Sequence, residues 1–558
     1  MITERKNKIR AMRGCMKKYL ILPLWAYLLS PVFVYGYNGG WGRILELQYF
    51  FHIFLSLLWA GFFVFLFGNR FRLQLVLLPF FLIAAADLFV VTNFDSRLST
   101  SYLMLAVTDA SEISEFLRSY AQPLAISALL FFTIYFGGLW GMRRTVVRAK
   151  PIPALACLLV LFASYAALFV KHLQGNSDFR TSALGVLGKE LSAPVGPIFQ
   201  MALTSLIVSE NAELLNQRNS HVFNAKQATE HKQNELYVLV IGESARPQNW
   251  SLFGYTRNTT PKIKSTNNII PLPNVITTDP LTSFAVPSLL SLENIHNFRG
   301  VLSHRSIVSA FREAGFETHW LSTQEADVWG GMIPHLASEA QHKRYFERTF
   351  DARLLPELSQ IIDDAAKEKK KTLVVLHTKG SHFEFSRRYP DSFKNFESEN
   401  NSRRNMLVDT YDNSILYTDW FLSRVIEIIR NARIPSLMLY SSDHGENLLD
   451  TSAGLFGHNI GNIYDLKTAA FAWISPEFND NFPKITAALT KNANKPISIG
   501  YFSHSLLHAA GIRTNNLNTT LSIFSDEFSP QPRQILLRGN ALFESDLDFC
   551  FSCSSITK

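Results

Sequence analysis

Acidic and imidazole side chains follow several short apolar segments in the C-terminal half of this sequence. Glu243 follows segment 236–242, and Asp443 with His444 follows segment 436–442. The other histidines near segment ends are His377, His382 and His458. Carboxylate and imidazole groups are ligands that Zn²⁺ accepts in catalytic sites, which keep one position open for chemistry. HExxH and paired CxxC motifs are absent, which excludes a helix-borne protease zinc and a zinc finger.

A hydroxyl beside such a metal could serve as a nucleophile, because the metal charge favours its alkoxide form. Spacing alone does not choose among the hydroxyl residues, which are Ser244, Thr277, Thr278, Thr282 and Ser283.

The C-terminal half alternates short apolar segments with helical periodicity. The apolar segments are 236–242, 317–322, 372–378 and 436–442, and the clearest helical segment is 411–432. This alternation predicts an α/β domain with a mainly parallel sheet. In open α/β sheets active groups gather at the carboxyl ends of the strands. We therefore expect the strand-end residues to meet in a catalytic domain at 236–558.

The N-terminal part contains long apolar runs, at 19–37, 46–67, 73–92, 123–141 and 152–171. Each is close to the ~20 residues needed to cross a bilayer as a helix. We therefore predict a five-helix transmembrane domain at 1–172. Residues 1–18 carry seven Lys or Arg and one Glu, which is +6 of the net +8. Basic residues favour the cytoplasmic side, so five crossings place everything after residue 173 outside the cytoplasm, and an even number would reverse this.

Two connecting segments have an amphipathic character. The loop 93–122 contains Thr108 and Glu112, four residues apart and on one face of a helix, which we expect at the membrane surface. Segment 173–235 is predicted to be an amphipathic helix followed by a polar linker.

Composition excludes several classes of protein. Hydrophobic residues make up 47% and charged residues 18% of the 558 residues, so disorder is excluded and a partly membranous chain is favoured. Outside the basic tail the charge is nearly balanced, which argues against nucleic-acid binding. The cysteines are too few and too scattered for a disulfide framework or a four-Cys zinc site: Cys15, Cys157, Cys550 and Cys553.

Five segments together resemble, in order, the motifs of bacterial phosphoethanolamine transferases. They are 241–261 (with GYTRNTTP), 274–291, 376–390, 411–427 and 440–459 (with SDHGE). The resemblance covers nearly the whole chain. It implies an inner-membrane enzyme with five N-terminal spans and a periplasmic domain of the alkaline phosphatase/sulfatase type.

The resemblance also implies roles for particular residues. The zinc ligands would be Glu243, Thr282, Asp443 and His444, and Thr282 would be the nucleophile. His382 and His458 would bind a substrate phosphate or a second zinc ion. Thr108 and Glu112 would contact the headgroup of the lipid donor.

The sequence departs from the family pattern at two places. The family often has Cys-Gly-Thr before the nucleophile and a Cys after it, joined as a disulfide. Here the corresponding residues are Thr278-Asp279-Pro280 and Ser288, so this loop has no such disulfide. Met104 stands where family members carry an Asn four residues before the Thr of the interfacial helix.

The implied reaction moves phosphoethanolamine from phosphatidylethanolamine to an envelope acceptor through a phospho-threonine intermediate. The acceptor could be lipid A or a core sugar of lipopolysaccharide, or another periplasmic molecule. A phosphoglycerol transferase would share the metal and the nucleophile, but the GYTRNTTP motif argues against it. A sulfatase or phosphatase would not need the membrane domain, and a non-catalytic membrane sensor is the alternative outside the enzymes.

Overall fold

The computed structural model describes most of five N-terminal helices and most of the chain from residue 213 to 547. The gaps in that second stretch are 215, 229–230, 232–233, 325–331, 347–348, 400–401, 452–453 and 538–539, and a few isolated residues are described before it. The chain forms two compact units that divide near residue 210. The loop 93–122 lies largely outside the described residues, and with it Thr108 and Glu112. Cys550 and Cys553 also lie outside them.

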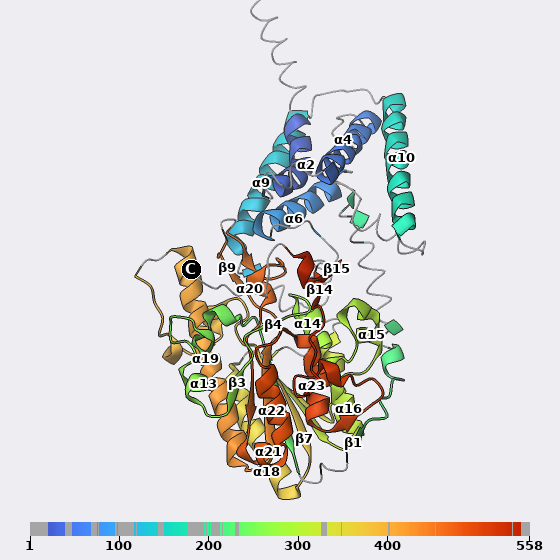
Figure 1. Cartoon of the computed structure of the whole chain (residues 1–558). Helices are drawn as coiled ribbons and strands as arrows, with labels where there is room; N and C mark the ends of the chain where they lie inside the picture. The colour runs from blue at the N-terminus through green and yellow to red at the C-terminus, as the bar shows by residue number, and fades with distance from the viewer. Residues whose placement is uncertain are drawn as a thin grey trace, which may run out of the picture. The chain divides into compact units, whose positions relative to one another are not determined.

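Apolar helices form the N-terminal unit at the places that the sequence predicted (Figure 1). They are α2 (Ile21–Asn38), α4 (Leu47–Phe67), α6 (Leu78–Phe94), α9 (Ala121–Met142) and α10 (Pro151–Gly175). Aromatic residues such as Phe63, Phe81 and Tyr135 make up much of the core between them. Because these segments lack charged residues over most of their length, they form apolar helices, and aromatic side chains fill much of the space between them.

Two of the described helices are both long enough and apolar enough to cross a membrane, at Ala121–Trp140 and Pro151–Lys171. The apolar stretches of the other three helices are shorter. Large apolar side chains on α9 and α10 are exposed, among them Trp140 (80%), Ile152 (81%) and Phe162 (73%). Exposed apolar surface of this extent marks an interaction surface rather than a water-facing one. The number of crossings remains a prediction.

A seven-stranded sheet organises the C-terminal unit, in the order β3-β11-β8-β2-β7-β5-β6. Its strands are β2 (Leu236–Gly242), β3 (Ile269–Pro271), β5 (Glu317–Ser322), β6 (His342–Tyr345), β7 (Thr372–His377), β8 (Ser436–Ser442) and β11 (Ala470–Ile474). Neighbours from β8 to β6 are parallel, and β11 runs antiparallel to both β8 and β3. The four predicted strands are confirmed, and the mainly parallel sheet with them.

The central strand β2 explains why its sequence is a continuous apolar run. All seven of its residues are buried, because helices cover both faces of the sheet. Tyr237, Leu239 and Ile241 belong to a core shared with α14 (Thr282–Leu290), α16 (Ile307–Glu313) and α23 (Phe502–Ala509). The helices α18 (Leu354–Glu368) and α19 (Arg403–Asn431) pack on each other and contact β7 and β8 (Figure 1). The predicted helix 411–432 lies almost entirely within α19.

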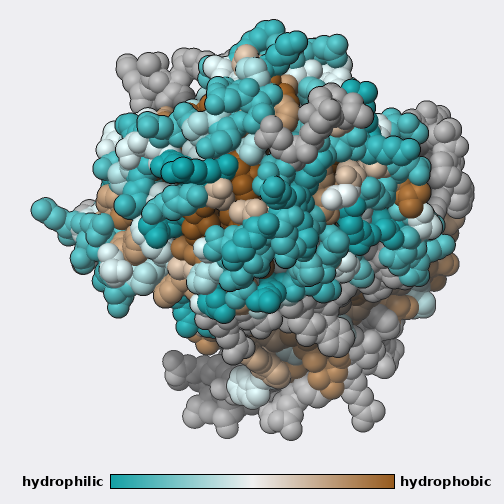
Figure 2. All heavy atoms as spheres, turned by 90° about the horizontal axis from the view of Figure 1, so that it is seen from below, coloured by the Kyte–Doolittle hydropathy of each residue, from teal (hydrophilic) through white to brown (hydrophobic). Residues whose placement is uncertain are grey.

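Smaller elements complete this unit. The helices are α13 (Pro261–Ser265), α15 (Phe298–Ser303), α17 (Met332–Ala337), α20 (Ile463–Leu466), α21 (Pro476–Asn481) and α22 (Pro483–Asn492). The strands are β1 (Lys226–Gln227), β4 (Val275–Ile276), β9 (Asn447–Leu448), β10 (Phe456–Gly457), β12 (Ile497–Ser498), β13 (Ile512–Arg513), β14 (Gln534–Leu537) and β15 (Asn540–Phe543). The face drawn in Figure 2 is mainly hydrophilic, with small hydrophobic areas between polar side chains.

The segment expected to be a polar linker is packed on the C-terminal unit instead. β1 pairs with β13, and Phe223 is 5% exposed. The buried Arg218 guanidinium is paired with Glu339 at 2.5 Å. This segment is polar without being a linker, because a polar side chain such as Arg218 pairs with a buried residue from a distant part of the chain.

Candidate metal centre

Three predicted ligands come together at the carboxyl edge of the sheet. Glu243, Asp443 and His444 are each at most 1% exposed, and their ligand atoms all lie within 4.8 Å of one another. His444 Nε2 lies 3.4 Å from Glu243 Oε1 and 3.5 Å from Asp443 Oδ2. Two carboxylates and one imidazole thus face a common point.

Strand register explains this meeting of residues 200 positions apart. β2 and β8 are parallel neighbours, and Gly242 pairs with Ser442. Glu243 follows Gly242 and Asp443 follows Ser442, so these two residues lie side by side at the same edge of the sheet. Ser244 has a positive φ of 55°, a backbone conformation that non-glycine residues rarely adopt and that often marks functional sites.

The two oxygens of Asp443 have different surroundings. Oδ1 accepts hydrogen bonds from the backbone N–H of Ser244 (3.1 Å) and of His444 (2.7 Å). Oδ2 is buried and has no hydrogen-bond partner within the described part of the chain. Buried polar atoms are nearly always satisfied, so a carboxylate oxygen without a donor fits a position that faces a cation.

The imidazole of His444 is also fixed by its surroundings. Its Nδ1 donates to the carbonyl oxygen of Gly445 at 2.7 Å, so Nε2 is the nitrogen that faces the carboxylates. This is the arrangement by which metal-binding histidines are usually oriented. Burial by itself would lower the pKa of His444, but the Asp443 carboxylate and the Gly445 carbonyl outweigh it and raise that pKa above its ordinary value.

Gln324 is a residue of this centre that the sequence analysis missed. Its Nε2 donates to Glu243 Oε2 at 3.1 Å and to the carbonyl oxygen of Thr378 at 3.1 Å. Ser244 Oγ donates to the other Glu243 oxygen at 2.8 Å. Gln324 comes two residues after the end of β5, so the strand-end rule that selected Glu243 could have found it too.

Thr282 presents its hydroxyl to the same point from the first residue of α14. Thr282 Oγ1 lies 3.3 Å from Glu243 Oε2 and 3.2 Å from His444 Nε2. Among the other candidate hydroxyls, Thr277 Oγ1 donates to the carbonyl oxygen of Asp279, and Ser244 Oγ contacts Glu243 alone of the three ligands. Thr282 thus brings its hydroxyl within 3.3 Å of two of the three ligands, which Thr277 and Ser244 do not.

Hydrogen bonds hold the loop before Thr282, where the sequence lacks the family's cysteines. Asp279 Oδ1 accepts from the N–H of Leu281 at 2.8 Å, and the carbonyl oxygen of Thr278 accepts from the N–H of Leu536 in β14 at 2.7 Å. Burial raises the pKa of Asp279 well above its ordinary range. A turn within the loop and a contact to β14 thus position Thr282.

The remaining candidate histidines lie around the three ligands without joining them. The His458 ring centroid is 4.3 Å from that of His444, and its Nδ1 is 3.2 Å from Glu446 Oε2. His382 stacks on Phe383 at 4.2 Å, and the Phe383 ring lies 6.4 Å from that of His458. His458 thus lies beside His444, and the Phe383 ring lies between His458 and His382 in this series of ring contacts.

His377, the last residue of β7, is in a different environment. It is 1% exposed, and neither ring nitrogen has a hydrogen-bond partner among the described residues. Burial lowers its pKa to about 4, so its ring is neutral near neutral pH.

The described residues fit a catalytic zinc ion. Carboxylate and imidazole are ligand types that catalytic zinc accepts, three protein ligands are the usual number, and a hydroxyl faces the remaining position. The unpartnered Asp443 Oδ2 agrees with this assignment.

Comparison with known proteins agrees with the fold of the C-terminal unit. The sequence profile of the sulfatase family matches residues 235–512. The chain is 25% identical to the phosphoethanolamine transferase EptC of Escherichia coli strain K12 in an alignment of 572 positions that covers 95% of each protein.

Solved structures show the same architecture. The integral membrane protein lipooligosaccharide phosphoethanolamine transferase A of Neisseria meningitidis matches with a TM-score of 0.64 and 19% identity, covering 90% of this chain and 97% of that one. The C-terminal periplasmic domain of E. coli EptC, solved as a complex with Zn, matches with a TM-score of 0.55 and 22% identity, covering 59% and 97%. The chain is thus similar over nearly its whole length to bacterial phosphoethanolamine transferases, and its C-terminal unit has the alkaline phosphatase/sulfatase-like fold.

Proposed function

We propose that this protein transfers phosphoethanolamine from phosphatidylethanolamine to an envelope acceptor, with Thr282 as the nucleophile of a zinc-dependent reaction. The observation that carries the proposal is the meeting of Thr282 Oγ1 with Glu243 Oε2 and His444 Nε2, at 3.3 and 3.2 Å. A nucleophile within hydrogen-bond reach of metal ligands is the expected arrangement for covalent catalysis at a metal.

Glu243, Asp443, His444 and Thr282 would hold the zinc ion. When bound, its charge favours the ionised form of the Thr282 hydroxyl and stabilises negative charge on a phosphoryl group. Binding a second zinc ion is the alternative role that we propose for His382 and His458.

The proposed reaction has two steps. Thr282 Oγ1 forms a bond to the phosphorus of the donor, the bond from phosphorus to the glycerol oxygen breaks, and the threonine proton ends on the released diacylglycerol. An acceptor hydroxyl next attacks the same phosphorus, which restores the Thr282 hydroxyl. His382 and His458 would bind the phosphoryl oxygens or the leaving oxygen.

The helices of the N-terminal unit would keep the enzyme next to a donor that never leaves the bilayer. We propose five crossings, a cytoplasmic N-terminus and a C-terminal unit on the periplasmic side of the inner membrane, which the basic residues between the apolar runs support. Thr108 and Glu112 stay predicted contacts to the donor headgroup. Reporter fusions after each helix would test the topology, and a cytoplasmic signal from the C-terminal unit would refute it.

Trapping the covalent intermediate tests the chemistry. Purified protein is incubated with phosphatidylethanolamine without acceptor, digested, and analysed by mass spectrometry. We expect a phosphoethanolamine adduct on Thr282 in the wild type and in Thr282→Ser, and none in Thr282→Ala. Loss of the nucleophile should lower kcat at least about a thousandfold, or ~4 kcal/mol. Ser283→Ala is the matched control, and an adduct on Ser283 or Thr278 would contradict the assignment.

We propose the acceptor by its chemical class, which is a molecule with a free hydroxyl. A lipopolysaccharide lipid A or core sugar, or another periplasmic molecule, offers the hydroxyl that the second step needs. Mass spectrometry of envelope lipopolysaccharide and proteins, with and without the gene, would identify the acceptor. A glycerol phosphate in place of phosphoethanolamine on the product would instead indicate a phosphoglycerol transferase.

A further inference from the structure

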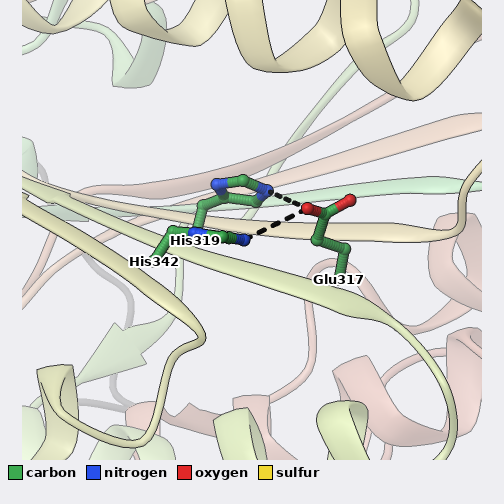
Figure 3. Close-up of side chains that lie close together, drawn as sticks. All are labelled: Glu317, His319 and His342. Carbon is green, nitrogen blue, oxygen red and sulfur yellow. Dashed lines mark hydrogen bonds and ion pairs between the residues drawn. The ribbon is translucent and has the colours of Figure 1, made fainter.

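A second group of histidine and carboxylate side chains lies close together at the opposite end of the strands from the candidate metal centre. Glu317 and His319 of β5 and His342 of β6 form what we call the β5–β6 cluster (Figure 3). Their ligand atoms all lie within 4.8 Å of one another. The reaction proposed above uses none of these residues.

Strand geometry places the three side chains together. Glu317 and His319 are two residues apart on β5 and so point to the same face of the sheet. β6 is an edge strand parallel to β5, and its first residue, His342, pairs with His319. Glu317 lies five residues before Ser322, the end of β5, or ~17 Å along the strand. The cluster is thus at the opposite end of β5 from Gln324 and the candidate metal centre.

Both imidazoles direct the same nitrogen toward one carboxylate oxygen (Figure 3). His342 Nε2 is 3.2 Å and His319 Nε2 is 3.9 Å from Glu317 Oε1. The two rings stack with centroids 4.8 Å apart. Bonds of about 2.0–2.2 Å to a tetrahedral ion would separate the ligand atoms by ~3.4 Å. The distance from His342 Nε2 to Glu317 Oε1 already meets that spacing, and the distance from His319 Nε2 exceeds it by ~0.5 Å.

The nearest lysine pairs with the other oxygen of Glu317, so the two imidazoles are the groups that contact Oε1. Lys370 Nζ lies 3.0 Å from the other Glu317 oxygen, Oε2, and is also paired with Glu368 at 2.5 Å. The His319 side chain is 11% exposed, so the cluster lies partly below the surface.

We propose that the β5–β6 cluster is a second transition-metal site, which binds a divalent ion such as Zn²⁺, Ni²⁺ or Cu²⁺ through one carboxylate oxygen and two imidazole nitrogens. Imidazole suits these ions better than Mg²⁺ or Ca²⁺, which prefer oxygen ligands. The bound ion joins the edge strand β6 to β5 and leaves the catalytic reaction unchanged.

Metal counting on the full chain in detergent tests the proposal. The protein is dialysed against Zn²⁺ at neutral pH, and bound metal per chain is measured by elemental analysis. His342→Ala, a change at a side chain that is 57% exposed, should bind one ion per chain fewer than the wild type. His335→Ala, at an exposed histidine of α17 outside the cluster, is the matched control and should bind the same amount as the wild type.

A second arm separates this site from the catalytic one. In Glu243→Ala protein, bound Cu²⁺ should show nitrogen hyperfine coupling from imidazole in its EPR spectrum, and the added change His342→Ala should remove that signal. Transfer activity of His342→Ala should equal that of the wild type. Equal metal content in wild type and His342→Ala would overturn the proposal and leave an ordinary histidine–carboxylate pair, whatever the outcome for Thr282.

Discussion

Replacing Gln324 should weaken zinc binding although Gln324 is not itself a predicted ligand. Its amide donates one hydrogen bond to the Glu243 carboxylate and one to the Thr378 carbonyl, both at 3.1 Å. Together they connect the carboxylate to the end of β7. Gln324→Ala removes both, so Glu243 can turn away from Asp443 and His444.

The size of the effect follows from these contacts. A hydrogen bond to a charged group contributes about 1.5–3 kcal/mol, and residues that orient a metal ligand typically change affinity ~10–100-fold. We therefore expect zinc to bind ~10–100-fold more weakly to Gln324→Ala, or about 1.4–2.7 kcal/mol. Gln324→Glu should be at least as harmful, because it places a second carboxylate beside Glu243.

Competition with a chromogenic chelator measures this affinity directly. Gln360→Ala is the matched control, since Gln360 is exposed on α18 and donates to Asp364 at 3.0 Å, outside both groups of metal-ligating side chains. Its zinc affinity should equal that of the wild type. If Gln324→Ala holds zinc as tightly as the wild type, Glu243 is either oriented by other contacts or is not a ligand.

Three other perturbations have definite expected results. Asp279→Asn keeps an acceptor for the loop turn and should retain activity, whereas Asp279→Ala should lower kcat without lowering zinc content; equal activity of both would show that the turn is dispensable. His377 has a native pKa of about 4, below its unfolded value, so the unfolded state binds more protons between about pH 4 and 6.5 and stability falls as pH falls through that range. His377→Leu should flatten this dependence by up to ~3 kcal/mol in urea unfolding, and an unchanged pH profile would count against it. Arg218→Ala breaks the buried pair with Glu339 and should cost ~3–5 kcal/mol of stability, while Arg424→Ala, at an exposed pair, should cost ~0–1; similar losses would refute the distinction.

Local patterns in the sequence determined the secondary structure. β2 and β8 end where the apolar runs end, and Glu243 and Asp443 follow them directly, because a strand buried on both faces must be apolar throughout and its polar successors mark its edge. The apolar helices were equally visible, since a membrane-length apolar run needs no partner to be recognised. The family's motifs carried the assignment of Thr282 where spacing left five hydroxyls open.

Only the tertiary structure decided which side chains face one another. The register between β2 and β8 brings Glu243 to His444, and that pairing of distant segments leaves no local pattern. The same holds for Arg218 and Glu339, whose buried contact attaches the polar segment before β2 to the C-terminal unit. It holds as well for His319 and His342, whose approach depends on β6 pairing beside β5. Periodicity records only which face of an element is buried, whereas contacts between elements depend on how the whole chain packs.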